Sequence, residues 1–221
     1  MKSLKCLCSI LLFSCTAYLY AEDIPVGYYN AIQGTQDSVL KATLHQIIKG
    51  GERYVYGSTT YHTTNNIKNG DTIWIKGDLK AYGTWHGFQS CDQQSDGSIW
   101  DMYSTTKRYF PIKGGSAAGM DIEHSLPKSW WGGTENEAYK DLYLLNPADR
   151  VANNNKSNYP PGILSDSNKV NNGTFFMGKD TQWKDYAFSI IDEYKGDFAR
   201  AYFYVATAYH DMKWDSKYAT Y

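Results

Sequence analysis

Glu123 and His124 are neighbours in the polar stretch Asp121–Gly133, and Pro127 closes any extended segment that carries them. Proline has no backbone N–H and cannot continue a sheet ladder, so a strand here must end before a loop. A carboxylate beside an imidazole is the smallest set of side chains that can support metal-assisted hydrolysis. One group holds a divalent cation while the other takes a proton from water. The pair therefore predicts a strand end and a candidate hydrolytic site at the same place.

A second dense stretch follows at Asp141–Pro160. Its apolar start, Asp141–Leu145, is predicted to be extended, and Pro147 suits the first turn of a helix. That helix is expected to reach about Lys156 and to end before Tyr159–Gly162. The predicted order is strand, loop, strand and helix, which can hold one cation between a strand-end carboxylate and a helix amide or carboxylate.

Oxygen ligands at such a site favour Mg²⁺, with Mn²⁺ or Ca²⁺ as alternatives, over Zn²⁺. The zinc spacing His-Glu-x-x-His is absent, and the next histidine after His124 is His210. A zinc site would have to draw on scattered histidines without a pattern. We therefore expect a hard divalent cation, with Mg²⁺ as the first choice.

The remaining segments predict an α+β fold, a mixed domain with short strands and several packing helices. A helix is expected to start at Asp37, with an apolar stripe along one side, and to end at Gly50-Gly51. Strands are predicted at Thr72–Lys76 and at Ser98–Ser104. A further helix is predicted to start at Gly196-Asp197, where aromatic residues recur at helical spacing.

Residues 1–21 have the pattern of an export signal. Two lysines and the short apolar run Leu7–Phe13 precede a small residue at Ala21, and the run is too short for a stable membrane anchor. Residues 22–221 would then form a single domain, exported to the extracellular space or the periplasm. As an alternative, Leu12–Cys15 resembles a relaxed lipobox, whose cysteine would carry the lipid of an outer-membrane lipoprotein.

Several segments together carry a resemblance to a known family. They are Glu123–Gly133, Asp141–Leu142, Asn153 and Lys156–Pro160, framed by Trp100–Ser104 and Glu193–Tyr202. This set resembles the endonuclease I family, a group of exported, non-specific nucleases with a His-Me finger (ββα-metal) active site. The resemblance extends from about residue 26 to the end of the chain.

The resemblance implies a function and a role for each matched residue. His124 would be the general base that activates water, and Glu123 and Asn153 would bind one Mg²⁺. The chain would be an exported, Mg²⁺-dependent hydrolase that cleaves phosphodiester bonds of DNA and RNA and leaves 5′-phosphate ends. An imidazole titrates near neutrality, which agrees with the role of a base at working pH. We expect a monomer.

Two departures from the family pattern concern the polar support of the site and the contact with the phosphate. Members often carry a histidine where this chain has Leu144, and some carry an arginine between the two dense stretches. This chain has only lysines there, at positions 128 and 140. The candidate replacements for the arginine are Arg150, Lys156 and Arg200, and the sequence does not choose between them. Members also commonly continue past Tyr221, so the chain is expected to be a fragment or to lack a terminal helix.

Two rival functions stay open. The first is a metal-dependent phosphoesterase specific for RNA, which would use the same groups. The second is a catalytically inactive, aromatic-rich surface module that binds glycans or peptides; the chain contains 20 tyrosines and 7 tryptophans. Charge speaks against a nucleic-acid binder, because loss of the signal moves the formal net charge from −1 to −3. Basic residues near the two stretches offset this locally, and we expect moderate affinity that weakens with salt.

Overall fold

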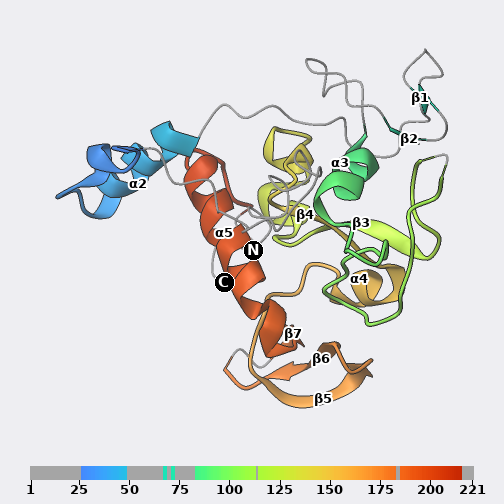
Figure 1. The fold of residues 1–221 in the computed structure, drawn as a ribbon. Helices are drawn as coiled ribbons and strands as arrows, with labels where there is room; N and C mark the ends of the chain where they lie inside the picture. Colours follow the sequence, from blue (N-terminus) through green and yellow to red (C-terminus); the bar gives the residue numbers. More distant parts are fainter. Residues whose placement is uncertain are drawn as a thin grey trace.

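The computed structural model describes residues 26–48, 67–68, 71–72, 83–112, 114–182 and 185–215. Helices and small antiparallel sheets alternate along these residues, which confirms the mixed α+β fold that the sequence predicts (Figure 1). Within them, no helix combines the length and the apolar character that crossing a bilayer requires. The short strands β1 (Ile67–Lys68) and β2 (Asp71–Thr72) pair with each other.

The centre of the fold is a two-stranded sheet followed by a helix. Strand β3 (Met120–His124) pairs antiparallel with β4 (Leu145–Asp149), and Glu123 lies opposite Asn146. Helix α4 (Arg150–Lys156) follows β4 without a loop. Its N-cap is Asp149, whose side chain accepts a hydrogen bond from Ala152 N at 2.9 Å.

Three apolar clusters surround this centre. The first lies between α4, α5 (Asp192–Ala208) and the antiparallel sheet of β5 (Leu164–Asn171), β6 (Phe175–Asp180) and β7 (Tyr186–Ile190). Its buried members come from segments far apart in the sequence: Met102, Tyr103, Ala148, Ala152, Phe175, Met177, Phe188, Ile190 and Phe198. Since Ala148 lies on β4 and Ala152 on α4, this cluster fixes the strand and the helix to the larger sheet.

The second cluster lies where α3 (Thr84–Cys91) meets the two-stranded sheet. It contains Trp85, Phe88, Ile99, Ala117, Met120 and Leu145. The third cluster contains Leu126, Trp130, Trp131, Tyr139, Leu144 and Val205, so it joins the short 3-10 helices η4 (Lys128–Trp131) and η5 (Ala138–Lys140) to α5. Strand β3 and the residues after it are therefore held from three directions, which favours a rigid site at its end.

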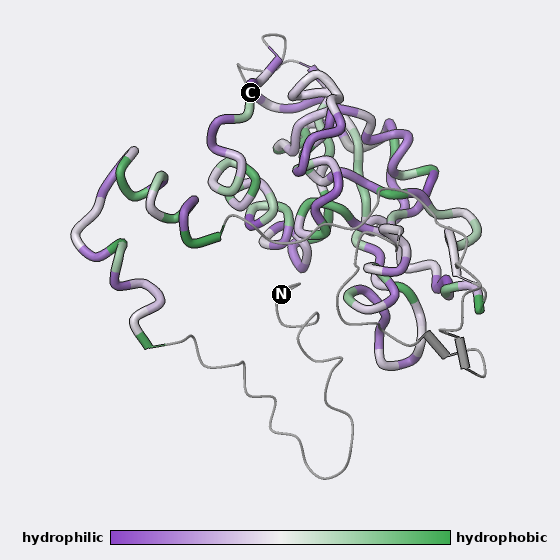
Figure 2. Tube along the Cα trace, turned by 90° about the horizontal axis from the view of Figure 1, so that it is seen from above, coloured by the Kyte–Doolittle hydropathy of each residue, from purple (hydrophilic) through white to green (hydrophobic). Residues whose placement is uncertain are grey.

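Helix α2 (Asp37–Ile48) confirms the helix predicted from Asp37. It contacts α5, and His45 and His210 lie there with ring centroids 4.1 Å apart. Residues 26–48 lie to one side of the rest of the fold in Figure 1 and in Figure 2, and the residues of α2 are exposed or half-buried. This segment is therefore remote from the central sheet.

The predicted strand at Asp141–Leu145 and the predicted helix start at Pro147 are wrong by about four residues. The strand is β4, which contains Pro147, and the residues before it form a turn in which Leu144 N donates to Asp141 O at 2.9 Å. A two-stranded sheet has only edge strands, where proline is tolerated. The helix begins after Asp149 because that residue supplies the capping carboxylate.

Two further expectations also need correction. Ser98–Ser104 is not a strand: it forms isolated bridges only, and the Asp101 carboxylate turns the chain by accepting from Tyr103 N at 2.8 Å. Helix α5 begins at Asp192 and not at Gly196, since acidic residues in its first turn suit the helix start. Of the predicted strand Thr72–Lys76, only Thr72 lies within the described residues.

Candidate active site

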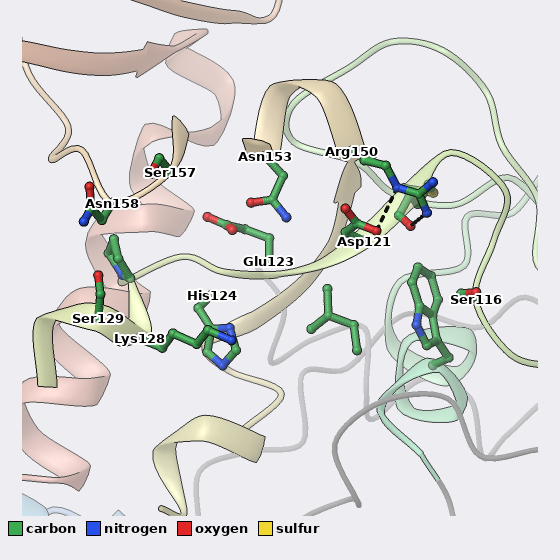
Figure 3. A pocket seen from close by; sticks show the side chains of 14 residues that line it. Ser116, Asp121, Glu123, His124, Lys128, Ser129, Arg150, Asn153, Ser157 and Asn158 are labelled. Carbon is green, nitrogen blue, oxygen red and sulfur yellow. Dashed lines mark hydrogen bonds and ion pairs between the residues drawn. The ribbon is translucent and has the colours of Figure 1, made fainter. Parts of the chain in front are cut away.

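A cavity of about 640 Å³ lies along β3 and between η4 and α4 (Figure 3). It is lined by Trp85, Ser116, Met120, Asp121, Ile122, Glu123, His124, Pro127, Lys128, Ser129, Arg150, Asn153, Ser157 and Asn158. Both dense stretches of the sequence thus contribute to one hollow. Three predicted site residues, Glu123, His124 and Asn153, meet there.

Glu123 is 4% exposed, and its charge is balanced inside the protein. Its Oε1 accepts from the Tyr103 hydroxyl at 2.9 Å and lies 2.7 Å from Nζ of Lys156. Burial raises the pKa of Glu123, and the adjacent Lys156 ammonium limits that rise. A carboxylate at a cavity wall that is held by one cation and one hydroxyl can exchange one of these two partners for a metal ion.

Lys156 differs from the sequence-based expectation of a cation at the phosphate. Its side chain is fully buried, with Nζ 5.2 Å from the Phe188 ring centroid and 3.5 Å from the His124 carbonyl oxygen. It does not line the cavity. Lys156 is therefore the internal counter-ion of Glu123. Both groups are buried, and each needs the other because an unpaired buried charge is strongly unfavourable.

His124 is buried against aromatic rings and keeps one ring nitrogen bonded to the backbone. Nε2 lies 3.1 Å from the Tyr139 carbonyl oxygen, and the rings of His124 and Tyr139 are 4.8 Å apart. A carbonyl only accepts, so Nε2 carries the proton and the lone pair of the neutral ring is on Nδ1. Burial, with a smaller contribution from the charges of Lys128 and Lys156, lowers the pKa of His124 to about 3, although the bond to the Tyr139 carbonyl opposes this shift. The ring is therefore a neutral base near pH 7.

Asn153 lies on α4, and its amide is beside the Glu123 carboxylate in Figure 3. It is the member of the run 153–155 that lines the cavity: Asn154 is exposed, and Asn155 Nδ2 donates to Val151 O at 2.8 Å. The start of α4 is fixed by the cap residue Asp149, whose carboxylate also pairs with the guanidinium of Arg108. That cap sets the helix phase, which turns Asn153 toward the cavity.

The donor set at this wall fits a hard cation. Glu123 offers a carboxylate oxygen and Asn153 an amide oxygen, and Mg²⁺ commonly takes one or two protein oxygens while its other ligands are water or phosphate. Among the described residues, no group of three or more histidine, cysteine or acidic side chains is placed to hold a metal. The two oxygen donors, Glu123 and Asn153, fit the ligand preference of a hard divalent cation such as Mg²⁺.

The other predicted cations separate in space. Arg150 lines the cavity, and its Nε donates to Asp121 Oδ1 at 3.0 Å while Nη2 donates to the Met120 carbonyl. Arg200 is not part of the cavity: it lies on α5 and pairs with Asp197 at 2.6 Å. Lys128, outside the predicted set, lines the cavity directly. Two features of the sequence pointed to this placement: Lys128 follows Pro127, where the strand must stop, and it lies in the interval where some family members carry an arginine.

Comparison with known proteins gives a consistent result. The sequence model of the family described as Endonuclease I matches residues 63–219. An extracellular ribonuclease of Bacillus subtilis (strain 168) is 26% identical over 204 residues, which are 91% of this chain and 59% of that protein. An extracellular ribonuclease of Bacillus amyloliquefaciens is 24% identical over 185 residues, 82% of this chain and 53% of that protein. The chain thus spans somewhat more than half the length of these curated relatives.

Proposed function

Because the chain belongs to the endonuclease I family, we propose that it is an exported, Mg²⁺-dependent nuclease that hydrolyses phosphodiester bonds of RNA and DNA. The observation that carries the proposal is a neutral imidazole, His124, beside the oxygen donors Glu123 and Asn153 in one cavity. The aromatic-rich binding module explains neither the buried counter-ion of Glu123 nor the orientation of His124.

The proposed chemistry is direct hydrolysis by water. Nδ1 of His124 takes a proton from a water molecule, which attacks phosphorus as the bond to the 3′ oxygen breaks. The products are a 5′-phosphate and a 3′-hydroxyl, to which solvent returns a proton. A Mg²⁺ ion held by Glu123 and Asn153 would supply positive charge to the phosphate oxygens and the leaving oxygen.

The protein groups around His124 prepare it for this role. The Tyr139 carbonyl fixes the tautomer, and the buried surroundings keep the ring unprotonated. The Lys156 ammonium favours the ionised form of Glu123 and limits the rise in its pKa that burial causes, which favours the carboxylate as a ligand. A general base typically contributes about 10²- to 10⁴-fold in rate.

Export is part of the proposal. It rests on the predicted signal in residues 1–21 and on the relatives, which are named extracellular. The extracellular space is favoured for that reason; the periplasm and a lipid anchor at Cys15 are the alternatives. The mass of the exported protein separates them, because cleavage after Ala21 and lipidation at Cys15 give different N-termini.

An RNA-specific enzyme is the second candidate, and the names of both relatives favour it. The deciding assay incubates the purified protein with plasmid DNA and with RNA, in Mg²⁺ or in chelator. We expect both substrates to be cut in Mg²⁺ and neither in chelator. Cleavage of RNA alone would support the second candidate, and no cleavage with any divalent metal would overturn the nuclease proposal. His124→Ala is expected to abolish most activity, and full activity in that variant would refute the site assignment.

A further inference from the structure

Three basic side chains lie at or under the cavity, and two of them already have a carboxylate partner. Lys156 is buried against Glu123 at 2.7 Å, and Arg150 pairs with Asp121 at 3.0 Å. Lys128 is exposed and, among the described residues, makes no salt bridge. Its positive charge at the cavity wall is thus the least compensated of the three.

Lys128 and His124 are held by the same residue, Tyr139. Nζ of Lys128 donates to the Tyr139 hydroxyl at 3.1 Å and lies 5.0 Å from the centroid of its ring. The carbonyl of the same tyrosine bonds Nε2 of His124 at 3.1 Å. In Figure 3 the Lys128 side chain runs toward the imidazole. Tyr139 thus contacts both side chains through different atoms, and the Lys128 ammonium is near enough for its charge to lower the pKa of His124.

The backbone under Lys128 is also fixed. Pro127 precedes Lys128. The carbonyl oxygen of Lys128 accepts a hydrogen bond from Gly133 N at 2.9 Å, in the turn that closes η4. The indole of Trp130, two residues on, donates to the Asn158 carbonyl at 3.0 Å, which ties this turn to the segment after α4. The stem of Lys128 therefore starts from a defined point between the two dense stretches of the chain.

We propose that Lys128 is the residue that contacts the substrate phosphate, in the place that an arginine would otherwise serve. This inference rests on the proposed nuclease function. The ammonium has a neutral hydroxyl and an aromatic ring as partners, both of which it can leave or keep when a phosphate oxygen approaches. An anion at this position would lie in the cavity that Glu123 and His124 also line. Arg150 and Lys156 would first have to give up a carboxylate.

The first test compares Lys128→Ala and Lys128→Arg with a control, Lys140→Ala. Lys140 carries the same charge, pairs with Glu137 and does not line the cavity. We expect kcat/KM to fall about 30- to 100-fold in Lys128→Ala, largely in kcat, because one charged transition-state contact is lost. Lys128→Arg should recover most of the rate, and Lys140→Ala should match the unaltered protein. Equal losses at positions 128 and 140 would overturn the proposal.

The second test reads binding without cleavage. In a His124→Ala background, the affinity for a short single-stranded RNA is measured against salt concentration, with and without Lys128→Ala. Loss of one phosphate contact should weaken binding and lower the slope of log affinity against log salt by about 0.7 to 1. An unchanged slope would contradict the inference. If the unaltered protein cuts neither RNA nor DNA, the proposed function fails, and the salt slope still decides whether Lys128 binds phosphate. Thermal unfolding of each variant confirms that it is folded.

Discussion

Two buried carboxylates, Glu123 and Asp141, use tyrosine hydroxyls in different ways. Asp141 Oδ2 accepts from Tyr204 at 2.8 Å and from Tyr209 at 2.6 Å, and Oδ1 accepts from Tyr143 N at 2.9 Å. These bonds fasten α5 to the turn before β4. Glu123, in contrast, has one tyrosine and one cation on a single oxygen and borders the cavity.

The difference separates a structural carboxylate from a candidate catalytic one. Asp141 spreads its bonds over both oxygens and lies away from the cavity, so it has little capacity for a further ligand. The Tyr103 hydroxyl and the Lys156 ammonium both contact Oε1 of Glu123, and the amide of Asn153 lies beside the carboxylate. Burial alone therefore does not distinguish the candidate catalytic acid. The two carboxylates differ in whether they face the cavity and in the kind of partner that each one has.

The largest expected effect separates the two acids by activity. Glu123→Gln should reduce the Mg²⁺-dependent cleavage rate by at least about 10²- to 10³-fold, because the carboxylate ligand is lost. Asp141→Asn should keep the rate per folded molecule close to that of the unaltered protein. Rates are measured on RNA and DNA after correction for the folded fraction. Equal losses in the two variants would erase the distinction drawn here.

Removal of the cation under Glu123 should be the largest effect on stability. Lys156→Met leaves a buried carboxylate without its charge partner, which destabilises proteins by about 3–5 kcal/mol. Adding Glu123→Gln to Lys156→Met should restore part of the loss, since no buried charge then stays unpaired. Urea unfolding of the two single variants and the double variant measures this coupling. Strictly additive losses would show that the ion pair is not coupled.

A somewhat smaller loss is expected at the structural carboxylate. Asp141→Ala leaves two tyrosine hydroxyls and one backbone N–H without their acceptor, at a cost of about 2–4 kcal/mol. Removing single donors, by Tyr204→Phe or Tyr209→Phe, should cost about 1 kcal/mol each. Thermal or urea unfolding checks the series. A neutral Asp141→Ala substitution would mean that α5 is held by apolar packing alone.

A separate effect, spread over several pH units, is a pH dependence of the free energy of unfolding that arises from His124. Its pKa is lowered to about 3 by burial, whereas the unfolded ring titrates near 6.5. Below about pH 6.5 the unfolded state takes up a proton that the folded state does not bind. The free energy of unfolding therefore decreases as the pH is lowered, by up to about 1.4 kcal/mol per pH unit, until about pH 3. Unfolding of the metal-free protein should show this slope, and His124→Gln should lack it. The same slope in both proteins would show that His124 is not buried as described.

Some of the site could be predicted from sequence because its chemistry is local. Glu123 and His124 are adjacent, and Pro127 forces the strand to end beside them. The boundary of α4 was misplaced because Pro147 suits both a helix start and an edge strand, and only the pairing with β3 decides between them. The strand predicted at Ser98–Ser104 failed for a similar reason. There the Asp101 carboxylate accepts a hydrogen bond from Asp149 N, a residue far along the chain.

The partners of the site residues could not be predicted, because they depend on tertiary packing. Lys156 was a candidate for the contact with the phosphate, but its ammonium lies over the ring of Phe188 and pairs with Glu123, to which Tyr103 also donates. Arg200 lies on α5 and pairs with Asp197, one turn earlier on the same helix. Charge in the sequence thus indicated how many cations were available, and packing decided which of them reach the cavity.

The most direct test of the account compares two neighbouring asparagines on α4. Asn153 lines the cavity beside Glu123, whereas Asn154 is exposed to solvent, so the substitutions to alanine are matched in type and in helix position. The measurement is the rate of RNA and DNA cleavage in Mg²⁺ by Asn153→Ala and by Asn154→Ala. We expect a large loss in Asn153→Ala alone, with Asn154→Ala equal to the unaltered protein. Equal rates in the two variants, or a loss confined to Asn154→Ala, would contradict it.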